Sequence, residues 1–184
     1  MGHFLDQLRF QDYGLYYKLY YIGLSSHFWG NFFYFFAAYG IVLSFLSFVY
    51  LIISKRINAL LCSLLAMGLA GLADFLITIF WSRPRPFVTH HQLMTPITKG
   101  LLIDATSFPS AHTYIVFAIA ASVFLYGHHK LGTALFIVAI LVGVSRIGAG
   151  LHYPSDVIAG ALLGLAAGIA AYLIIEKLEK NWEE

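Results

Sequence analysis

Residues 131–176 read LGTALFIVAILVGVSRIGAGLHYPSDVIAGALLGLAAGIAAYLIIE, two long apolar runs on either side of a short polar turn. The runs 131–149 and 154–176 each approach the roughly 20 apolar residues that an α-helix needs to cross the hydrocarbon core of a bilayer. Arg146 lies near the end of the first run, His152 lies in the turn, and Asp156 follows it closely. The stretch predicts a transmembrane helical hairpin with ionisable side chains at one end.

The composition of the whole chain agrees with a membrane protein. Of its 184 residues, 60% are hydrophobic and only 11% are charged, whereas about a quarter of a soluble domain is charged. Three more apolar runs, at 31–53, 58–80 and 108–127, bring the expected number of spans to five. The net charge of +2 gives no electrostatic argument for a nucleic-acid partner.

The predicted fold is therefore an all-α integral membrane protein, a compact bundle of about five transmembrane helices that forms a single domain over residues 1–184. Small residues recur within the spans and permit close helix approach in lipid; examples are Gly68, Gly71, Gly160, Gly164 and Gly168.

The segment 1–29 differs from the spans because charged residues interrupt its apolar ones. Asp6, Arg9, Asp12 and Lys18 lie within it, and five tyrosines fall between residues 13 and 21. This pattern predicts an N-terminal amphipathic helix in the membrane interface with its tyrosines at headgroup depth. A sixth span is the alternative, and it would place three or four charges in lipid.

Basic residues in the short connections predict the orientation. Lys55 and Arg56 follow the first span, Lys130 precedes the fourth, and Lys177 and Lys180 follow the last. Alternation of five spans puts all of them on one side, which the positive-inside rule assigns to the cytoplasm. The other side receives residues 1–29, 81–106 and 149–154 together with three arginines. Because these arginines break the rule, we expect them to have a task other than topology.

Two of these arginines, Arg83 and Arg85, lie in the sequence WSRPRPF at 81–87. Planar guanidinium groups on a proline-stiffened stretch suit the oxygens of a phosphate group. Two arginines near lipid headgroups can also act as an interfacial anchor alone, so this stretch by itself leaves both interpretations open.

The sequence SFPSAH at 107–112 opens the third predicted span. We expect Ser107 to cap this helix and Pro109 to lie in its first turn, leaving backbone N–H groups available to an anion. His112 is then placed to protonate a leaving oxygen. The alternative for His112 is an interfacial histidine bound to a neighbouring carbonyl.

The third arginine belongs to the polar turn of the hairpin. Arg146 in an apolar span costs at least ~2.5 kcal/mol unless an anion accompanies it. Asp156 lies four residues after His152, close enough to accept a hydrogen bond from one ring nitrogen and leave the other free to attack. Asp156 can alternatively act only on the dipole of the last helix, which would leave Arg146 and His152 unexplained.

Together, these stretches resemble the signature of the type-2 phosphatidic acid phosphatase superfamily, which also contains the vanadium haloperoxidases. Its third part, Ser-Arg, five residues, His, three residues, Asp, matches at Ser145, Arg146, His152 and Asp156. Its second part, Pro-Ser-Gly-His, appears as PSAH at 109–112, with Ala111 in place of glycine. Its first part, Lys, six residues, Arg-Pro, ends at Arg85-Pro86 but has Thr78 at the lysine position. The matched motifs span residues 78–156.

The resemblance implies a role for each matched residue. His152 would attack phosphorus, Asp156 would orient it, and His112 would protonate the leaving oxygen. Arg83 is expected to replace part of the charge that the usual lysine supplies. The implied phosphate-binding set is Arg85, Arg146, Ser110, Ala111, Ser145, Arg83 and Thr78.

Within the superfamily, the chain looks most like the small bacterial undecaprenyl-diphosphate phosphatases. That resemblance implies hydrolysis of a lipid diphosphate to the monophosphate in the cell inner membrane, on the extracytoplasmic side, with lipid-carrier recycling and bacitracin resistance as consequences. It implies no cofactor and no metal, and the acidic residues near the motifs, Asp104 and Asp156, do not make a Mg²⁺ cluster. The partners expected are the lipid substrate and the membrane, and the sequence leaves the oligomeric state open. His90, His91 and Lys99 can contact a second phosphate or remain solvated.

Other functions remain open from the sequence. A phosphatase for phosphatidylglycerol phosphate or phosphatidic acid would carry the same motifs, and a lipid phosphotransferase would differ only in the acceptor of the phosphoryl group. From another class, a transporter or flippase of lipid phosphates would line a path with the same arginines.

Overall fold

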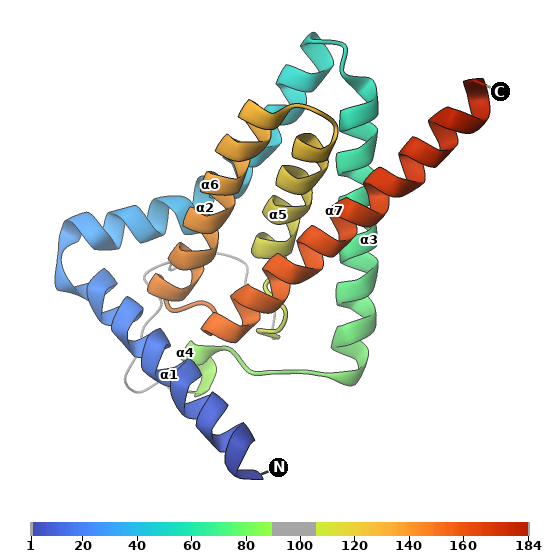
Figure 1. Ribbon diagram of the computed structural model, residues 1–184. Coiled ribbons are helices and arrows are strands. Elements are labelled where there is room, and N and C mark those ends of the chain that lie inside the picture. Colours follow the sequence, from blue (N-terminus) through green and yellow to red (C-terminus); the bar gives the residue numbers. More distant parts are fainter. Residues whose placement is uncertain (1, 90–105, 184) are drawn as a thin grey trace.

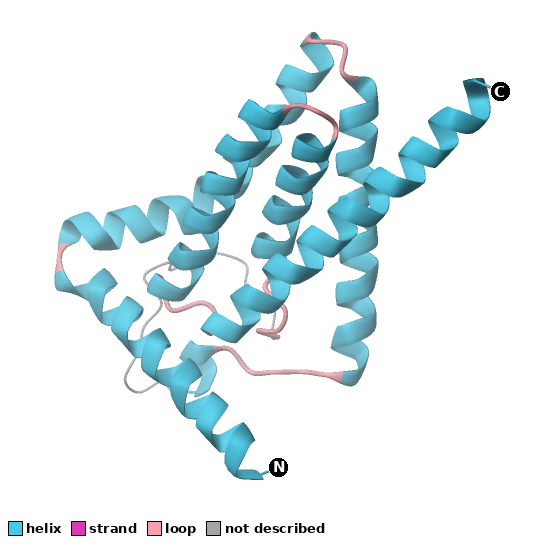
Figure 2. Cartoon of the chain, in the orientation of Figure 1, coloured by secondary structure: helices cyan, strands magenta, loops and turns pink. Residues whose placement is uncertain are grey.

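A computed structural model describes residues 2–89 and 106–183. Within these ranges, helices joined by short loops make up the chain (Figure 2). An isolated bridge between Pro84 and Thr106 is the only β pairing in the same ranges. The helices are α1 (Gly2–Ser25), α2 (His27–Ile53), α3 (Ile57–Phe80), α4 (Pro86–Thr89), α5 (Ala111–Leu125), α6 (His129–Gly148) and α7 (Pro154–Glu183). The predicted all-α class is confirmed.

Helices α2, α3, α6 and α7 form a bundle with α5 in its middle (Figure 1). Helices α2, α3, α6 and α7 are long and apolar enough to cross a membrane, whereas α5 has only 15 residues. Helix α5 packs against α3, α6 and α7, and most of its side chains are buried. The surrounding helices expose large apolar side chains such as Phe75, Ile79 and Leu173, as expected for contact with lipid. The protein is a multi-pass membrane protein.

The predicted span at 108–127 is longer than the helix observed. Helix α5 begins at Ala111 with Ser110 as its N-cap residue, so the expectation that Ser107 caps the helix is wrong. The hydroxyl of Ser107 instead donates to Asp156. A helix enclosed by protein does not have to match the thickness of the hydrocarbon, which explains why α5 can be short.

A stripe of glycines brings α7 against α5. A Cβ atom at Gly160 would lie 2.7 Å from the carbonyl oxygen of Ser110, and one at Gly164 would lie 2.4 Å from that of Tyr114. The predicted close approach is therefore confirmed for this stripe, whereas Gly68 and Gly71 face open space. The contact sets the beginning of α5 beside the first turns of α7.

Helix α1 crosses the end of the bundle at which α5 and α7 begin (Figure 1). Its predicted helical state is confirmed, and the headgroup depth of its tyrosines stays a prediction; two of the five pack against protein. Tyr16 and Tyr20 are fully buried against Ile147 and Tyr153, because residues four apart share one helix face. Gly150 permits this docking: its φ is +76°, and a Cβ there would lie 2.7 Å from the ring of Tyr20.

Candidate active site

The three predicted motifs meet at the end of the bundle that α1 crosses (Figure 1). The stretch before α4 supplies Arg85, the N-terminus of α5 supplies Ser110 to His112, and the α6–α7 turn supplies His152. The glycine contact between α5 and α7 holds two of these elements together, and the backbone N–H of Ser110 donates to the carbonyl oxygen of Asp156 at 3.1 Å.

His152 is 1% exposed, and its two ring nitrogens face different partners. Nδ1 lies 2.7 Å from the carbonyl oxygen of Ser107, which can only accept a hydrogen bond, so Nδ1 carries the proton. Nε2 lies 3.0 Å from Arg85 and 3.4 Å from Arg146, which can only donate. Nε2 therefore has an available lone pair directed at two cations, the state required of a nucleophile.

The acid–base state of His152 follows from this environment. Burial lowers the pKa of His152 to about 4; its contacts with Asp156 oppose the shift, and the charges of Arg146 and Arg85 add to it. The ring is therefore neutral near pH 7, with Nε2 unprotonated.

Asp156 is completely buried at the start of α7. Its Oδ2 accepts hydrogen bonds from the hydroxyl of Ser107 at 2.5 Å and from the backbone N–H of Tyr153 at 2.9 Å. Nδ1 of His152 is 3.8 Å from the same oxygen, so the predicted direct hydrogen bond between these two side chains is wrong. The carbonyl of Ser107 accepts the hydrogen bond from Nδ1–H of His152. Because the hydroxyl of the same residue donates to Asp156, Ser107 connects the carboxylate to the imidazole.

Arg85 and Arg146 face His152 from two sides. Arg85 is 6% exposed and also donates to the carbonyl of Leu151 at 3.2 Å, and Arg146 is 4% exposed and donates to the carbonyl of Ala37 at 3.1 Å. Nε of Arg146 is buried and has no hydrogen-bond partner among the described residues. Two guanidinium groups around one imidazole nitrogen form a ready site for phosphate oxygens.

The first turn of α5 completes this group of residues. Ala111 is its first residue, so the N–H groups of the first turn have no acceptor within the helix and point out of its end. Ser110 is buried and its hydroxyl accepts from Thr113 at 2.9 Å. His112 is the second residue of α5 and is half-buried in the same turn.

Three other predicted phosphate ligands are placed differently. Thr78 donates its hydroxyl to the carbonyl of Phe75 in its own helix, and no described contact joins it to His152. Ser145 is buried on α6, with no hydrogen-bond partner for its hydroxyl among the described residues. Arg83 does not contact His152; it binds Oδ1 of Asp156, the carboxylate oxygen farther from the imidazole.

The remaining sequence predictions cannot be placed. His90, His91, Lys99 and Asp104 lie outside the described residues. Within the described ranges, no group of three or more histidine, cysteine or acidic side chains is arranged to hold a metal ion, and metal independence stays a prediction.

Comparison with known proteins decides the family. The model of the PAP2 superfamily matches residues 59–180, a range that contains every residue described above around His152 apart from Ala37. The chain belongs to the PAP2 superfamily.

Curated relatives are similar over part of their length. The undecaprenyl-diphosphatase BcrC of Bacillus subtilis is 38% identical over 104 residues, which cover 55% of this chain and 50% of that protein. The bacitracin transport permease protein BcrC of Bacillus licheniformis is 46% identical over 72 residues, covering 39% and 35%. The chain thus matches about a third to a half of the length of these relatives.

Two solved structures are similar over most of the chain. The crystal structure of Aquifex aeolicus LpxE aligns with a TM-score of 0.61 at 29% identity, covering 83% of this chain and 91% of that one. A transmembrane PAP2-type phosphatidylglycerolphosphate phosphatase from Bacillus subtilis aligns with a TM-score of 0.65 over 95% of this chain and 87% of that one; at 21% identity it supports the fold alone.

Proposed function

We propose that this PAP2 protein is a metal-independent lipid phosphatase that hydrolyses undecaprenyl diphosphate to the monophosphate through a phosphohistidine at His152. The observation that carries the proposal is the environment of His152: Nδ1 is tied to a carbonyl, and Nε2 faces two buried arginines. Relatives named as undecaprenyl-diphosphatases support the choice of substrate.

The first step transfers the terminal phosphoryl group. Nε2 of His152 attacks phosphorus, and the bond from phosphorus to the bridging oxygen breaks. His112 gives a proton to that oxygen, so the lipid monophosphate departs. Arg85, Arg146 and the amides at the start of α5 stabilise the charge on the equatorial oxygens, where it gathers in the transition state.

The second step regenerates the histidine. His112, now unprotonated, accepts a proton from a water molecule, whose oxygen attacks the phosphorus. The bond from phosphorus to Nε2 breaks, and inorganic phosphate is released with His152 neutral again. The carbonyl of Ser107 holds the Nδ1 proton in both steps and keeps the ring in one tautomer.

A lipid substrate fits the surroundings of the site. A cavity of about 750 Å³ lies between α1, the stretch 81–84 and the start of α7, with largely apolar walls that include Trp81, Phe108 and Ile158. Trp81 and Ile158 are among the exposed apolar side chains of the bundle. A prenyl chain can remain in contact with such walls, and Tyr153, the residue next to His152, lines the same cavity.

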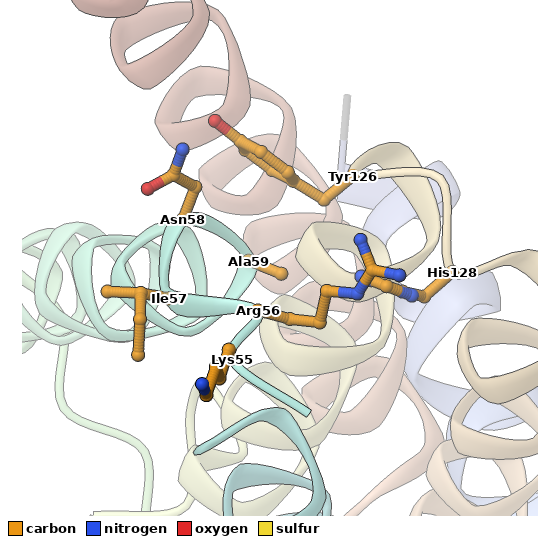
Figure 3. Close-up of a pocket in the computed structure, with 7 residues that line it drawn as sticks. All are labelled: Lys55, Arg56, Ile57, Asn58, Ala59, Tyr126 and His128. Carbon is orange, nitrogen blue, oxygen red and sulfur yellow. The ribbon is translucent and has the colours of Figure 1, made fainter. Parts of the chain in front are cut away.

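We place the site on the extracytoplasmic side of the cell inner membrane. The opposite end carries basic residues around a cavity of about 240 Å³, where Lys55, Arg56 and His128 gather (Figure 3). Basic connections favour the cytoplasm. Labelling of Ser82→Cys, but not Lys130→Cys, by an impermeant thiol reagent added outside intact cells would support this orientation, and the reverse pattern would contradict it. Native Cys62 is buried and gives little background.

The experiment that tests the proposal is phosphate release in detergent. Undecaprenyl diphosphate is compared with phosphatidylglycerol phosphate and phosphatidic acid, with EDTA present and with His152→Ala as the control. Release from the prenyl substrate that resists EDTA and disappears in the variant is expected. Release from a glycerolipid alone would keep the mechanism and change the substrate, and release that survives in His152→Ala would overturn the mechanism. Transport without hydrolysis by a folded protein would favour a lipid-phosphate transporter.

A further inference from the structure

Arg83 and Arg85 belong to the same stretch but contact different residues of the site. Pro84 forms a bridge with Thr106, and the carbonyl of Arg83 accepts a hydrogen bond from the backbone N–H of Ser107 at 2.7 Å. Side chains two residues apart usually share a side of an extended chain, but here Arg85 reaches Nε2 of His152 and Arg83 reaches Oδ1 of Asp156. The two arginines therefore hold the imidazole and the carboxylate from different directions.

Arg83 supplies the main cationic contact of Asp156. Its Nη1 donates to Oδ1 at 2.8 Å, whereas Oδ2 is occupied by Ser107 and Tyr153. Apart from His152, Arg83 is the only basic side chain in the described ranges that lies within ion-pair distance of this carboxylate. A completely buried carboxylate is stable only with such partners, so the position of Asp156 depends on Arg83.

Asp12 of α1 fixes the position of Arg83 in turn. Its Oδ2 accepts from Nη2 of Arg83 at 2.7 Å and from the hydroxyl of Ser155 at 2.7 Å, and its Oδ1 accepts from the backbone N–H of Ser155 at 2.9 Å. The guanidinium carbon lies 3.9 Å from the ring centre of Tyr153. The side chain of Asp12 is only 10% exposed, so this contact is largely sheltered from screening by solvent.

We propose that Asp12 and Arg83 are positioning residues for the phosphoryl transfer: Asp12 holds Arg83, Arg83 holds Asp156, and Asp156 with Ser107 holds the nucleophile. Helix α1 is then part of the catalytic apparatus and not only a membrane contact. The inference rests on the proposed function of His152. The sequence predicts that Arg83 binds phosphate in place of the missing lysine. The inference instead makes Arg83 a residue that positions Asp156.

The two roles of Arg83 predict different kinetics. A residue that binds the phosphate of the substrate contributes to KM and to inhibition by inorganic phosphate. A residue that only orients the nucleophile lowers kcat and leaves both of those constants nearly unchanged. Residues that orient a reacting group through a neighbour typically contribute about 10- to 100-fold.

The test is a double-mutant cycle in detergent with the substrate that the wild type hydrolyses. Arg83→Ala should lower kcat by about 10- to 100-fold, Asp12→Ala should lower it by about 10-fold, and the double variant should equal Arg83→Ala, because Asp12 acts through Arg83. KM and the inhibition constant of inorganic phosphate should stay within about threefold of wild type. Lys18→Ala, an exposed residue of the same helix, is the matched control and should leave kcat unchanged.

Asp12→Asn is the control for misfolding, because it keeps the size of the side chain and a carbonyl oxygen that can accept from Ser155. It should lower kcat while its thermal unfolding midpoint stays near that of wild type. Additive losses in the cycle, a large rise in KM for Arg83→Ala, or full activity of Asp12→Asn would overturn the inference. Activity that survives in His152→Ala would overturn the proposed function instead, so the two failures are distinguishable.

Discussion

Replacing Arg146 by methionine should separate catalysis from stability. Among the described residues, the guanidinium of Arg146 contacts only the carbonyl of Ala37 and Nε2 of His152, and its Nε has no partner. No carboxylate in the described ranges forms an ion pair with it. Replacing a buried ionic group by an apolar side chain of similar volume is often neutral or stabilising by about 1–4 kcal/mol.

The expected result has two parts. Arg146→Met should unfold at the wild-type temperature or above it, by about 2–4 °C for each kcal/mol in a chain of this size. Its kcat/KM should fall by about 10²–10³, or roughly 2.7–4 kcal/mol, the cost of removing one donor from the charge of a transition state. The measurements are thermal unfolding in detergent, followed by tryptophan fluorescence, and phosphate release from the same preparation.

Arg56→Met is the matched control, because Arg56 is exposed at the opposite end of the bundle. It should change neither the unfolding temperature nor kcat/KM. The reasoning fails if Arg146→Met unfolds well below wild type, since Arg146 would then support the fold. It also fails if kcat/KM stays within about threefold of wild type.

Four further outcomes are expected. Since burial, with Arg146 and Arg85, lowers the pKa of His152 to about 4, the acid limb of the kcat/KM profile should lie near pH 4, and an acid limb near 6.5 would contradict this. His112→Asn should lower kcat by about 10²–10⁴ through loss of the general acid, and near-normal turnover would remove His112 from that role. Millimolar EDTA should leave the rate unchanged; a loss restored by Mg²⁺ would show that metal independence is wrong. Gly150→Ala should lower the free energy of unfolding by about 1–3 kcal/mol, measured by thermal unfolding, because Gly150 has a positive φ and a Cβ there would meet the ring of Tyr20. If the variant is as stable as wild type, α1 does not pack on this turn as described.

Much of the bundle was predictable because lipid imposes a length and a composition on the helices that face it. Four of the five predicted spans have that length, and the hairpin of α6 and α7 breaks at the polar turn as expected. Helix α5 was predicted too long because protein surrounds it on several sides. Hydropathy does not distinguish an apolar helix enclosed by others from one in contact with lipid.

The docking of α1 could be predicted only in part. Its charges indicated a helix outside the hydrocarbon, but Tyr16 and Tyr20 are buried in protein. The available signal was their spacing of four, which puts both rings on one face, together with Gly150 in the turn that they cover. Neither feature indicates by itself that one packs against the other, because that depends on how the α6–α7 turn is folded.

The site residues were predictable where they belong to a motif. His152, Arg146 and Arg85 come together as expected. The role of Ser107 in orienting His152 was missed, because Ser107 contacts the ring through its own backbone carbonyl. A carbonyl has no sequence signature. The contact between Asp12 and Arg83 joins residues far apart in the chain, and only the docked α1 brings them together.

The most direct test of the account is the trapping of the phosphorylated enzyme. Protein quenched in alkali during turnover of ³²P-labelled undecaprenyl diphosphate should carry label that is stable to alkali and lost in acid. Mass spectrometry should assign it to the peptide containing His152, and His152→Ala should carry none. Rapid phosphate release with no labelled protein at any quench time, or label on another residue, would contradict the proposal that His152 is the nucleophile.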